Sequence, residues 1–296
     1  MKAALFAALF LDAGIYLVTW FRSATKTAAS AIPSVIEVII GFITNFFDTL
    51  GIGSFAPTTS FYKLRKLVPD QQIPGTLNVG HAIPTFLQAI IFITVVKVDI
   101  VTLALLVAAS AAGAWLGAGV VARWSRRKVQ IGMGLALLGA AALMAASQLN
   151  LVPGGGTALS LEGPRLWLGI AGNFFLGAIM TIGIGLYAPC MILVSLLGMS
   201  PLAAFPIMMG SCAFLMPVAG MRFIKENCYS LKAAVGLAVG GVPAVLLAAF
   251  LVKSLPLAAV RWLVVVVVVY TAGAMLRSAF LERGTPVDAT PRLAEG

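Results

Sequence analysis

Long apolar segments limit how this chain can fold more than any other feature of its sequence. They run roughly over residues 3–21, 32–61, 74–96, 98–122, 128–149, 166–198, 201–224, 231–252 and 256–280. A helix of about 20 apolar residues crosses a hydrocarbon layer of about 30 Å. Only 10% of the residues are charged, whereas soluble domains carry about 25%. The sequence therefore predicts an all-α polytopic membrane protein.

The first apolar run follows Lys2 and ends at Phe21. It has the length of either a signal peptide or a membrane helix, and no clear small-residue cleavage site follows Arg22. We therefore expect an extra transmembrane helix in residues 1–30. Gly and Pro clusters divide the remainder into a membrane repeat at 31–150, a linker at 151–164, a second repeat at 165–281 and a polar tail at 282–296.

The net charge of +10 fits the excess of Lys and Arg on cytoplasmic loops of membrane proteins. No basic stripe is interleaved with aromatic residues, so we expect no nucleic-acid partner. The only histidine is His81, and Cys190, Cys212 and Cys228 lack metal-ligand spacing. We predict no metal, no cofactor and no enzymatic activity, because no nucleophile–base pair is evident.

A short motif occurs twice. Gly51–Pro57 reads G-I-G-S-F-A-P and Gly183–Pro189 reads G-I-G-L-Y-A-P, with five of seven positions identical at an offset of 132. Thr49 and Thr181 match at the same offset, and each motif precedes an apolar segment with a central glycine. The agreement in order and spacing indicates an internal repeat.

The basic residues predict the topology. They gather at 22–26, 63–66, 123–128, 222–232 and 277–292, and we assign these groups to the cytoplasm. Each motif-bearing segment must then enter and leave on one side, as a re-entrant hairpin or as two full crossings. This gives an N-terminal helix plus two inverted-topology repeats, each a broken-helix hairpin followed by three transmembrane helices. The N-terminus lies outside and the C-terminus in the cytoplasm.

Each motif suits a break between two helices. Gly51 and Gly53 disfavour helix by about 1 kcal/mol each, and Pro57 is tolerated in the first turn of a new helix. Such backbone at membrane depth is buried or lines a wet cavity, and the new helix N-terminus favours an anion. The predicted substrate-binding residues are Gly51, Gly53, Ser54, Thr58, Thr59, Asn78, His81, Thr181, Gly183, Gly185 and Ser211. The alternative is that the glycines serve close helix packing.

A polar stripe follows the first motif. Asn78, His81 and Thr85 lie at i, i+3 and i+7, and Gln88 continues the same face. Polar stripes in membrane helices usually face the protein interior or a cavity. His81 either binds an anion or carries protons when it titrates, or it forms local hydrogen bonds. Its counterpart in the second half is Ser211.

Two acids lie inside apolar sequence. Glu37 and Asp48 are eleven residues apart, close to three helical turns, so they share a face with Asn45. An intramembrane charge costs about 2.5–3.5 kcal/mol on insertion scales. Asp48 is predicted to couple protons, or else to cap the turn. Gly169 and Met180 replace the two acids in the second half.

With these residues the chain resembles the sulfite exporter TauE/SafE family, also called toluene sulfonate uptake permeases. The resemblance rests on the two Gly-rich turns that end at Pro57 and Pro189, and on the stretch from Pro74 to His81. It covers roughly residues 34–280, and Ser54 stands where many members carry another glycine. The resemblance implies transport of a sulfur oxyanion, such as sulfite or an organosulfonate, across the bacterial inner membrane with proton coupling.

The leading hypothesis is thus a secondary transporter that exports a small anion bound at two opposed helix N-termini. Asp48 or His81 would carry the coupled proton. We expect a small anion and membrane lipid as partners, and a homodimer stays open as the oligomeric state. The alternatives are a cation or metal permease that uses Asp48 and Glu37, and a membrane module that transports nothing.

Overall fold

The computed structural model describes residues 2–25, 31–151, 156–183, 185–251 and 257–281. The protein is all-helical, with 81% of residues in helices. Within these ranges the only β-type pairing is an isolated bridge between Ala158 and Met199. Six helices of the described part are long and apolar enough to cross a membrane. The chain is therefore a membrane-spanning helical protein, and the predicted tail at 282–296 lies outside the described residues.

The helix boundaries follow the apolar segments closely. After α1 (Lys2–Ala24), the first half contains α2 (Val35–Thr49), α3 (Phe55–Arg65), the 3-10 turn η1 (Asp70–Gln72), α4 (Ile73–Gly80), α5 (Ala82–Val95), α6 (Ile100–Val121) and α7 (Arg126–Gln148). The second half contains α8 (Gly163–Met180), α9 (Tyr187–Leu196), α10 (Pro201–Lys225), α11 (Leu231–Leu251) and α12 (Leu257–Leu281).

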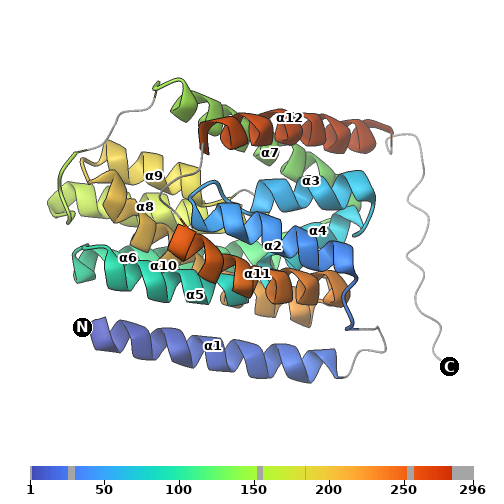
Figure 1. Ribbon diagram of the computed structural model, residues 1–296, viewed down its shortest axis with the longest axis horizontal. Coiled ribbons are helices and arrows are strands. Elements are labelled where there is room, and N and C mark those ends of the chain that lie inside the picture. Colours follow the sequence, from blue (N-terminus) through green and yellow to red (C-terminus); the bar gives the residue numbers. More distant parts are fainter. Residues whose placement is uncertain (1, 26–30, 152–155, 184, 252–256, 282–296) are drawn as a thin grey trace.

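The helices form one bundle along a common long direction (Figure 1). α1 lies at one edge against α10 and α5, and α7 packs along α12 at the opposite edge. Inside the bundle, α2 packs along α11, α8 along α6, and α10 contacts α4, α5 and α6. The broken helices α4–α5 and the long α10 are therefore central.

Each G-I-G-x-x-A-P motif interrupts a helix. α2 ends at Thr49, and the chain turns through Gly51 (φ 82°) and Gly53 (φ 91°) before α3 begins. α8 ends at Met180, and Gly183 (φ 107°) precedes α9. Positive φ is accessible to glycine at little cost, whereas a side chain makes it strained.

The helices on either side of the turns are short. α2 and α3 have 15 and 11 residues, and α8 and α9 have 18 and 10 residues. At 1.5 Å per residue, they measure about 22, 16, 27 and 15 Å. Each is shorter than the ~30 Å hydrocarbon layer. Between the two possibilities that the sequence leaves open, these lengths favour hairpins that do not cross fully.

The spacing of the polar stripe after the first motif predicted one regular helix. In the structure the stripe is divided between two helices. α4 ends at Gly80 and α5 begins at Ala82, with His81 at φ −81° and ψ −9° between them. Pro84 has no N–H, so the carbonyl of Gly80 lacks its i+4 donor and the helix is interrupted there. The N–H of His81 still reaches the Leu77 carbonyl at 3.1 Å, so the segment is kinked and not broken open.

Two further contacts place the ends of the elements. The Tyr16 hydroxyl of α1 donates to the Val79 carbonyl of α4 at 2.7 Å and is fully buried. The described part of the linker lies across the start of α6, because the N–H of Leu161 donates to the Thr102 hydroxyl at 3.1 Å. The start of α8 therefore lies at the same end of the bundle as the start of α6.

Candidate functional site

The two turns meet at one small cavity. From the first turn it is lined by Ile52, Gly53 and Ala56, from the second by Gly185, Tyr187 and Pro189, and from α7 by Ala140 and Met144. Its volume is about 20 Å³, which is the space of about one water molecule. Equivalent positions of the repeated motif, Gly53 and Gly185, thus face one point in the interior.

A buried carboxyl group lies beside this cavity. The Gln88 side-chain amide of α5 donates to Asp48 Oδ2 at 2.9 Å and to the Thr49 hydroxyl at 3.0 Å. Ser54 donates its backbone N–H and its hydroxyl to the same carboxyl group. The Tyr187 hydroxyl of α9 lies 3.2 Å from Asp48 Oδ2 and 2.8 Å from Gln88 Oε1. Asp48 therefore joins the second turn to the first.

The Tyr187 hydroxyl links Asp48 to Gln88. Both hydrogens of the Gln88 amide are used on acceptors, so its Oε1 faces Tyr187 and accepts from that hydroxyl. The hydroxyl has a single hydrogen, which Asp48 Oδ2 at 3.2 Å shares as a second acceptor. Because Asp48 is 2% exposed, its carboxyl group depends on these protein donors and not on water.

His81 connects the kink to the first hairpin. Its Nδ1 lies 3.0 Å from Asn45 Oδ1, and its Nε2 lies 3.1 Å from the Thr58 hydroxyl. The Asn45 amide nitrogen donates to the Gly41 carbonyl at 2.7 Å, so Oδ1 is its free acceptor. The imidazole therefore carries hydrogen on Nδ1 and accepts at Nε2 from Thr58. Of the two roles that the sequence leaves open, these contacts match the local one.

The second half repeats this link with other residues. The Asn173 amide of α8 donates to the Ser211 hydroxyl of α10 at 2.9 Å and to the Leu106 carbonyl at 2.7 Å. Asn45–His81 and Asn173–Ser211 thus tie the first helix of each hairpin to the following span. Both pairs are fully buried, and Asn173 is a residue that the sequence patterns did not single out.

Several predicted binding residues lie away from the cavity. The Asn78 amide donates to the Pro74 carbonyl of its own helix at 2.9 Å, and the Thr181 hydroxyl donates to the Ala178 carbonyl at 2.7 Å. Asn78 was expected to hold the anion between the turns, but it is not among the residues that line the cavity. The Thr59 hydroxyl is buried without a hydrogen-bond partner.

The remaining glycines are packing positions of the turns. A Cβ on Gly51 would lie 3.2 Å from the Phe205 ring, and one on Gly183 would lie 2.9 Å from Met133 Cε. Nothing lies within 4 Å of a Cβ built on Gly53 or Gly185. The first glycine of each motif therefore serves close packing, and the second leaves open space.

Glu37 and Asp48 do not form one ion site. Eleven residues of helix separate them by about 16 Å. Glu37 belongs to a capping box at the start of α2. Its Oε2 accepts from the Ser34 N–H at 2.7 Å, and the Ser34 hydroxyl accepts from the Glu37 N–H. Lys232 Nζ lies 4.0 Å from Glu37 Oε2. These contacts account for Glu37 without an ion, and they remove the geometric basis for pairing it with Asp48.

A second polar cluster lies at the end of α3. Asp70 Oδ2 accepts from Lys63 Nζ at 2.6 Å and from the Gln130 amide at 2.9 Å, with Arg126 at 3.9 Å. Lys63 Nζ also donates to the Ser278 hydroxyl of α12 at 3.1 Å. The Lys63 and Asp70 side chains are only 13% and 7% exposed. The sequence placed Lys63 among topology-setting charges and did not single out Asp70.

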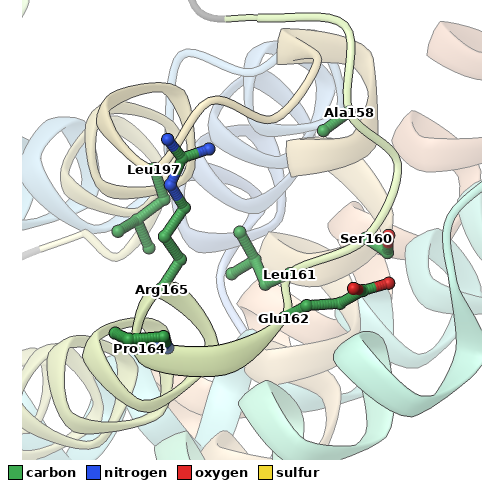
Figure 2. A pocket seen from close by; sticks show the side chains of 7 residues that line it. All are labelled: Ala158, Ser160, Leu161, Glu162, Pro164, Arg165 and Leu197. Atoms are coloured by element: carbon green, nitrogen blue, oxygen red, sulfur yellow. The ribbon is translucent and has the colours of Figure 1, made fainter.

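The opposite end of the bundle is hollowed. A pocket lies between the linker, the start of α8 and the end of α9 (Figure 2). Its volume is about 490 Å³. Its polar lining includes Glu162 and Arg165, and the Arg165 guanidinium extends toward the end of α9 near Leu197 (Figure 2). This pocket is separate from the small cavity between the turns.

Comparison of the chain with protein-family models, with curated proteins and with solved structures finds no match to any of them. The functional proposal therefore depends on the residues and contacts described above.

Proposed function

We propose that this protein is a secondary transporter that exports a small sulfur oxyanion, such as sulfite or an organosulfonate, across a bacterial inner membrane with proton coupling. The observation that carries the proposal is the meeting of two copies of one turn motif at a single cavity beside Asp48. Transporters built from repeats place the substrate site between discontinuous helices in this way.

The helix packing supports two inverted repeats at 31–150 and 165–281. If the halves are equivalent, α2 corresponds to α8, α6 to α11 and α7 to α12. The α2–α11 contact then corresponds to the α8–α6 contact, and the α7–α12 contact corresponds to itself. The hairpins also start at opposite ends, because α2 begins beside Lys232 at the start of α11, whereas α8 begins beside the start of α6. A pseudo-twofold axis in the membrane plane accounts for both observations.

The basic residues support an orientation. In Figure 1 the ends of α1, α3 and α12 lie on the right, as do the α6–α7 and α10–α11 connections. These are the segments that carry the groups of Lys and Arg. By the positive-inside rule this end is cytoplasmic, with the N-terminus outside and the C-terminus inside.

The cavity suits an anion because two helix N-termini reach it. α3 and α9 begin at Phe55 and Tyr187, and the side chains of the residues before them, Ser54 and Leu186, make no capping hydrogen bond. The first N–H groups of a helix have no acceptor within it, and they carry the positive end of the dipole. Two such ends in a dry site attract negative charge from opposite directions.

Asp48 supplies the coupling. Its carboxyl group accepts from the N–H and the hydroxyl of Ser54 at the start of α3, so an ionised Asp48 competes with the anion for the same donors. A proton on Asp48 removes that competition, and anion and proton therefore bind together. Sulfite leaving with one proton carries one net negative charge outward, which the inside-negative potential favours by about 2.3 kcal/mol per 100 mV.

The cavity is too small for sulfite as it stands, because it holds about one water. Substrate entry thus requires the two hairpins to separate. The Lys63–Asp70 cluster holds the end of α3 against α7 and α12, whereas the pocket at the opposite end is open to the start of α8. This conformation fits a state that is closed toward the basic end.

The test is ligand-dependent thermal stabilisation of the purified protein, with sulfite, thiosulfate, sulfate and nickel compared. Gly185→Leu fills the cavity, and Gly139→Leu is its control, because Gly139 is an exposed position of α7 with nothing within 4 Å of its Cβ. We expect sulfite to stabilise the wild type and Gly139→Leu but not Gly185→Leu. Stabilisation by nickel alone would overturn the proposal. Binding without sulfite flux in proteoliposomes would indicate a module that does not transport.

A further inference from the structure

Two contacts join α6 to α10 near the end of the bundle where the groups of Lys and Arg gather. At the end itself, Arg123 Nη2 lies 3.0 Å from Glu226 Oε1. Farther inside, the Arg222 guanidinium lies over the Trp115 indole, with Cζ 4.5 Å from the ring centroid. Trp115 comes eight residues before Arg123, which is about 12 Å along a helix. The two contacts therefore bound one stretch of the seam between α6 and α10.

Gly119 lies between these two contacts. It comes four residues after Trp115 and four residues before Arg123, so the three positions share one side of α6. A Cβ built on Gly119 would have no atom within 4 Å. Because Trp115 and Arg123 both contact α10, the open space at Gly119 is a notch at the edge of the seam.

The Arg222 side chain has donors to offer at this notch. Among the described residues, none makes a hydrogen bond or an ion pair with it, and its ring contact with Trp115 supplies no hydrogen-bond acceptor for its five N–H groups. Helical side chains lean toward the N-terminus of their helix, so Arg222 leans away from the basic end (Figure 1). Long basic side chains near a membrane surface usually extend the other way, toward water. Trp115 thus holds a guanidinium group at a depth where it lacks an anionic partner.

The outer side of the notch is apolar. Trp115, Leu116 and Val120 are 49%, 52% and 58% exposed, and α6 is one of the helices that can cross a membrane. Exposed Lys225 adds a cation one turn after Arg222. A ligand that fits this place needs a negative group beside Arg222 and an apolar part along α6. A glycerophospholipid with an anionic headgroup has both, because its phosphodiester is attached to acyl chains.

We propose that the seam between α6 and α10 binds one anionic glycerophospholipid, with its phosphodiester at Arg222 and Gly119 and an acyl chain along the exposed face of α6. Arg222, Lys225 and Arg123 supply three positive charges there, against the single carboxylate of Glu226. Hydrogen bonds from arginine to phosphate are charge-assisted and strong, and basic pockets between membrane helices bind lipid headgroups in this way. The site lies on the lipid-facing surface, so it is independent of the cavity between the turns.

The experiment uses the full chain, delipidated in detergent, with phosphatidylglycerol or phosphatidylcholine added at equal mole fraction. Native mass spectrometry counts the retained lipids, and thermal unfolding measures the stabilisation. We expect each chain to retain one phosphatidylglycerol and to unfold at a higher temperature, whereas phosphatidylcholine gives neither effect. Equal retention of the two lipids would overturn the proposal. Equal stabilisation by inorganic phosphate would do the same, because the phosphate group alone would then account for the binding.

Arg222→Gln tests the position of the headgroup. It should lower the retention of phosphatidylglycerol by at least about fivefold, the factor for one cation near an anionic surface. Its control is Arg65→Gln, which removes the same charge from an exposed position at the end of α3, on the same side of the bundle (Figure 1). Equal losses in the two variants would indicate general charge attraction and would overturn the site.

Gly119→Leu tests the notch without changing the charge. Its side chain would fill the open space between Trp115 and Arg123, so retention should fall as it does in Arg222→Gln. The control is Gly139→Leu, because Gly139 is an exposed glycine of α7 that also has nothing within 4 Å of its Cβ. Equal retention in the two glycine variants would overturn the site. The comparison of the two lipids in the wild type needs no variant, so a misfolded variant does not leave the question open.

Discussion

Neutralising Asp70 should destabilise the protein far more than breaking an exposed ion pair. In Asp70→Asn the shape of the side chain is kept, but Lys63 Nζ loses its anionic partner at 2.6 Å. Removing one partner of a buried pair typically costs about 3–5 kcal/mol, because the other charge stays buried. Lys63 is 13% exposed and keeps the Ser278 hydroxyl, so we expect a smaller cost than for a fully buried pair, about 2–3 kcal/mol.

The assay is thermal unfolding of purified protein in detergent. For chains of about 150–250 residues, 1 kcal/mol shifts Tm by about 2–4 °C. Asp70→Asn should therefore lower Tm by about 4–12 °C. The matched control is Glu226→Gln, which breaks the 3.0 Å Arg123–Glu226 pair, whose side chains are 70% and 32% exposed. Exposed pairs contribute about 0–1 kcal/mol.

A double variant tests the physical cause. Lys63→Met with Asp70→Leu removes both charges, so no lone ammonium group is left inside. It should be less destabilised than Asp70→Asn alone, because the cost comes from the unpaired charge and not from a lost attraction. If Asp70→Asn and Glu226→Gln shifted Tm equally, or if the double variant were the least stable, the buried-pair reasoning would be refuted.

Two other properties follow from the contacts of single residues. Gly183→Ala forces a side chain into φ 107° and within 2.9 Å of Met133, so it should lower the free energy of unfolding by about 1–3 kcal/mol. Its control is Gly185→Ala, whose new Cβ meets nothing within 4 Å. That variant should stay within about 0.5 kcal/mol of the wild type in the same unfolding assay. Burial, and then the Glu226 carboxylate, raises the pKa of the Cys228 thiol, so iodoacetamide should modify it with a midpoint above the ordinary ~8.5, and Glu226→Gln should lower that midpoint. Because the unfolded thiol ionises first, its contribution to stability falls as pH rises above ~8.5.

The sequence predicted the spans and the breaks well because both are local. About 20 apolar residues make a membrane helix regardless of its neighbours, and Gly51, Gly53 and Gly183 mark turns because their φ values are positive. The kink at His81 was missed, although Pro84 three residues later was a readable signal. Pro84 has no N–H to donate to the Gly80 carbonyl. The spacing of polar residues along a helix does not reveal a missing donor of this kind.

The contacts across the two halves were beyond the sequence patterns. Tyr187 is part of the second motif, but nothing local says that its hydroxyl reaches Asp48, 139 positions away in the chain. Likewise, Glu37 and Asp48 share a helix face as predicted, yet their separation along the helix gives them different roles. Helical periodicity shows that two residues lie on the same side of a helix, but not that they lie close together along its axis. The capping box with Ser34 accounts for Glu37.

The asymmetry of the two turns bears on how coupling can work. The backbone of the motif is duplicated, so each half can offer a helix N-terminus to one ligand. The same turn geometry is needed at both of these N-termini if they are to face that ligand. A coupled proton needs only one carrier, and a second carboxylate at the same cavity would repel both the first and the anion. In the proposed mechanism the second half therefore needs no acid at the position that Met180 holds in place of Asp48. Met180→Asp should then weaken anion binding even where it preserves the fold. The new carboxylate would place a second negative charge beside the proposed anion site, where it would repel the anion that the two helix dipoles attract.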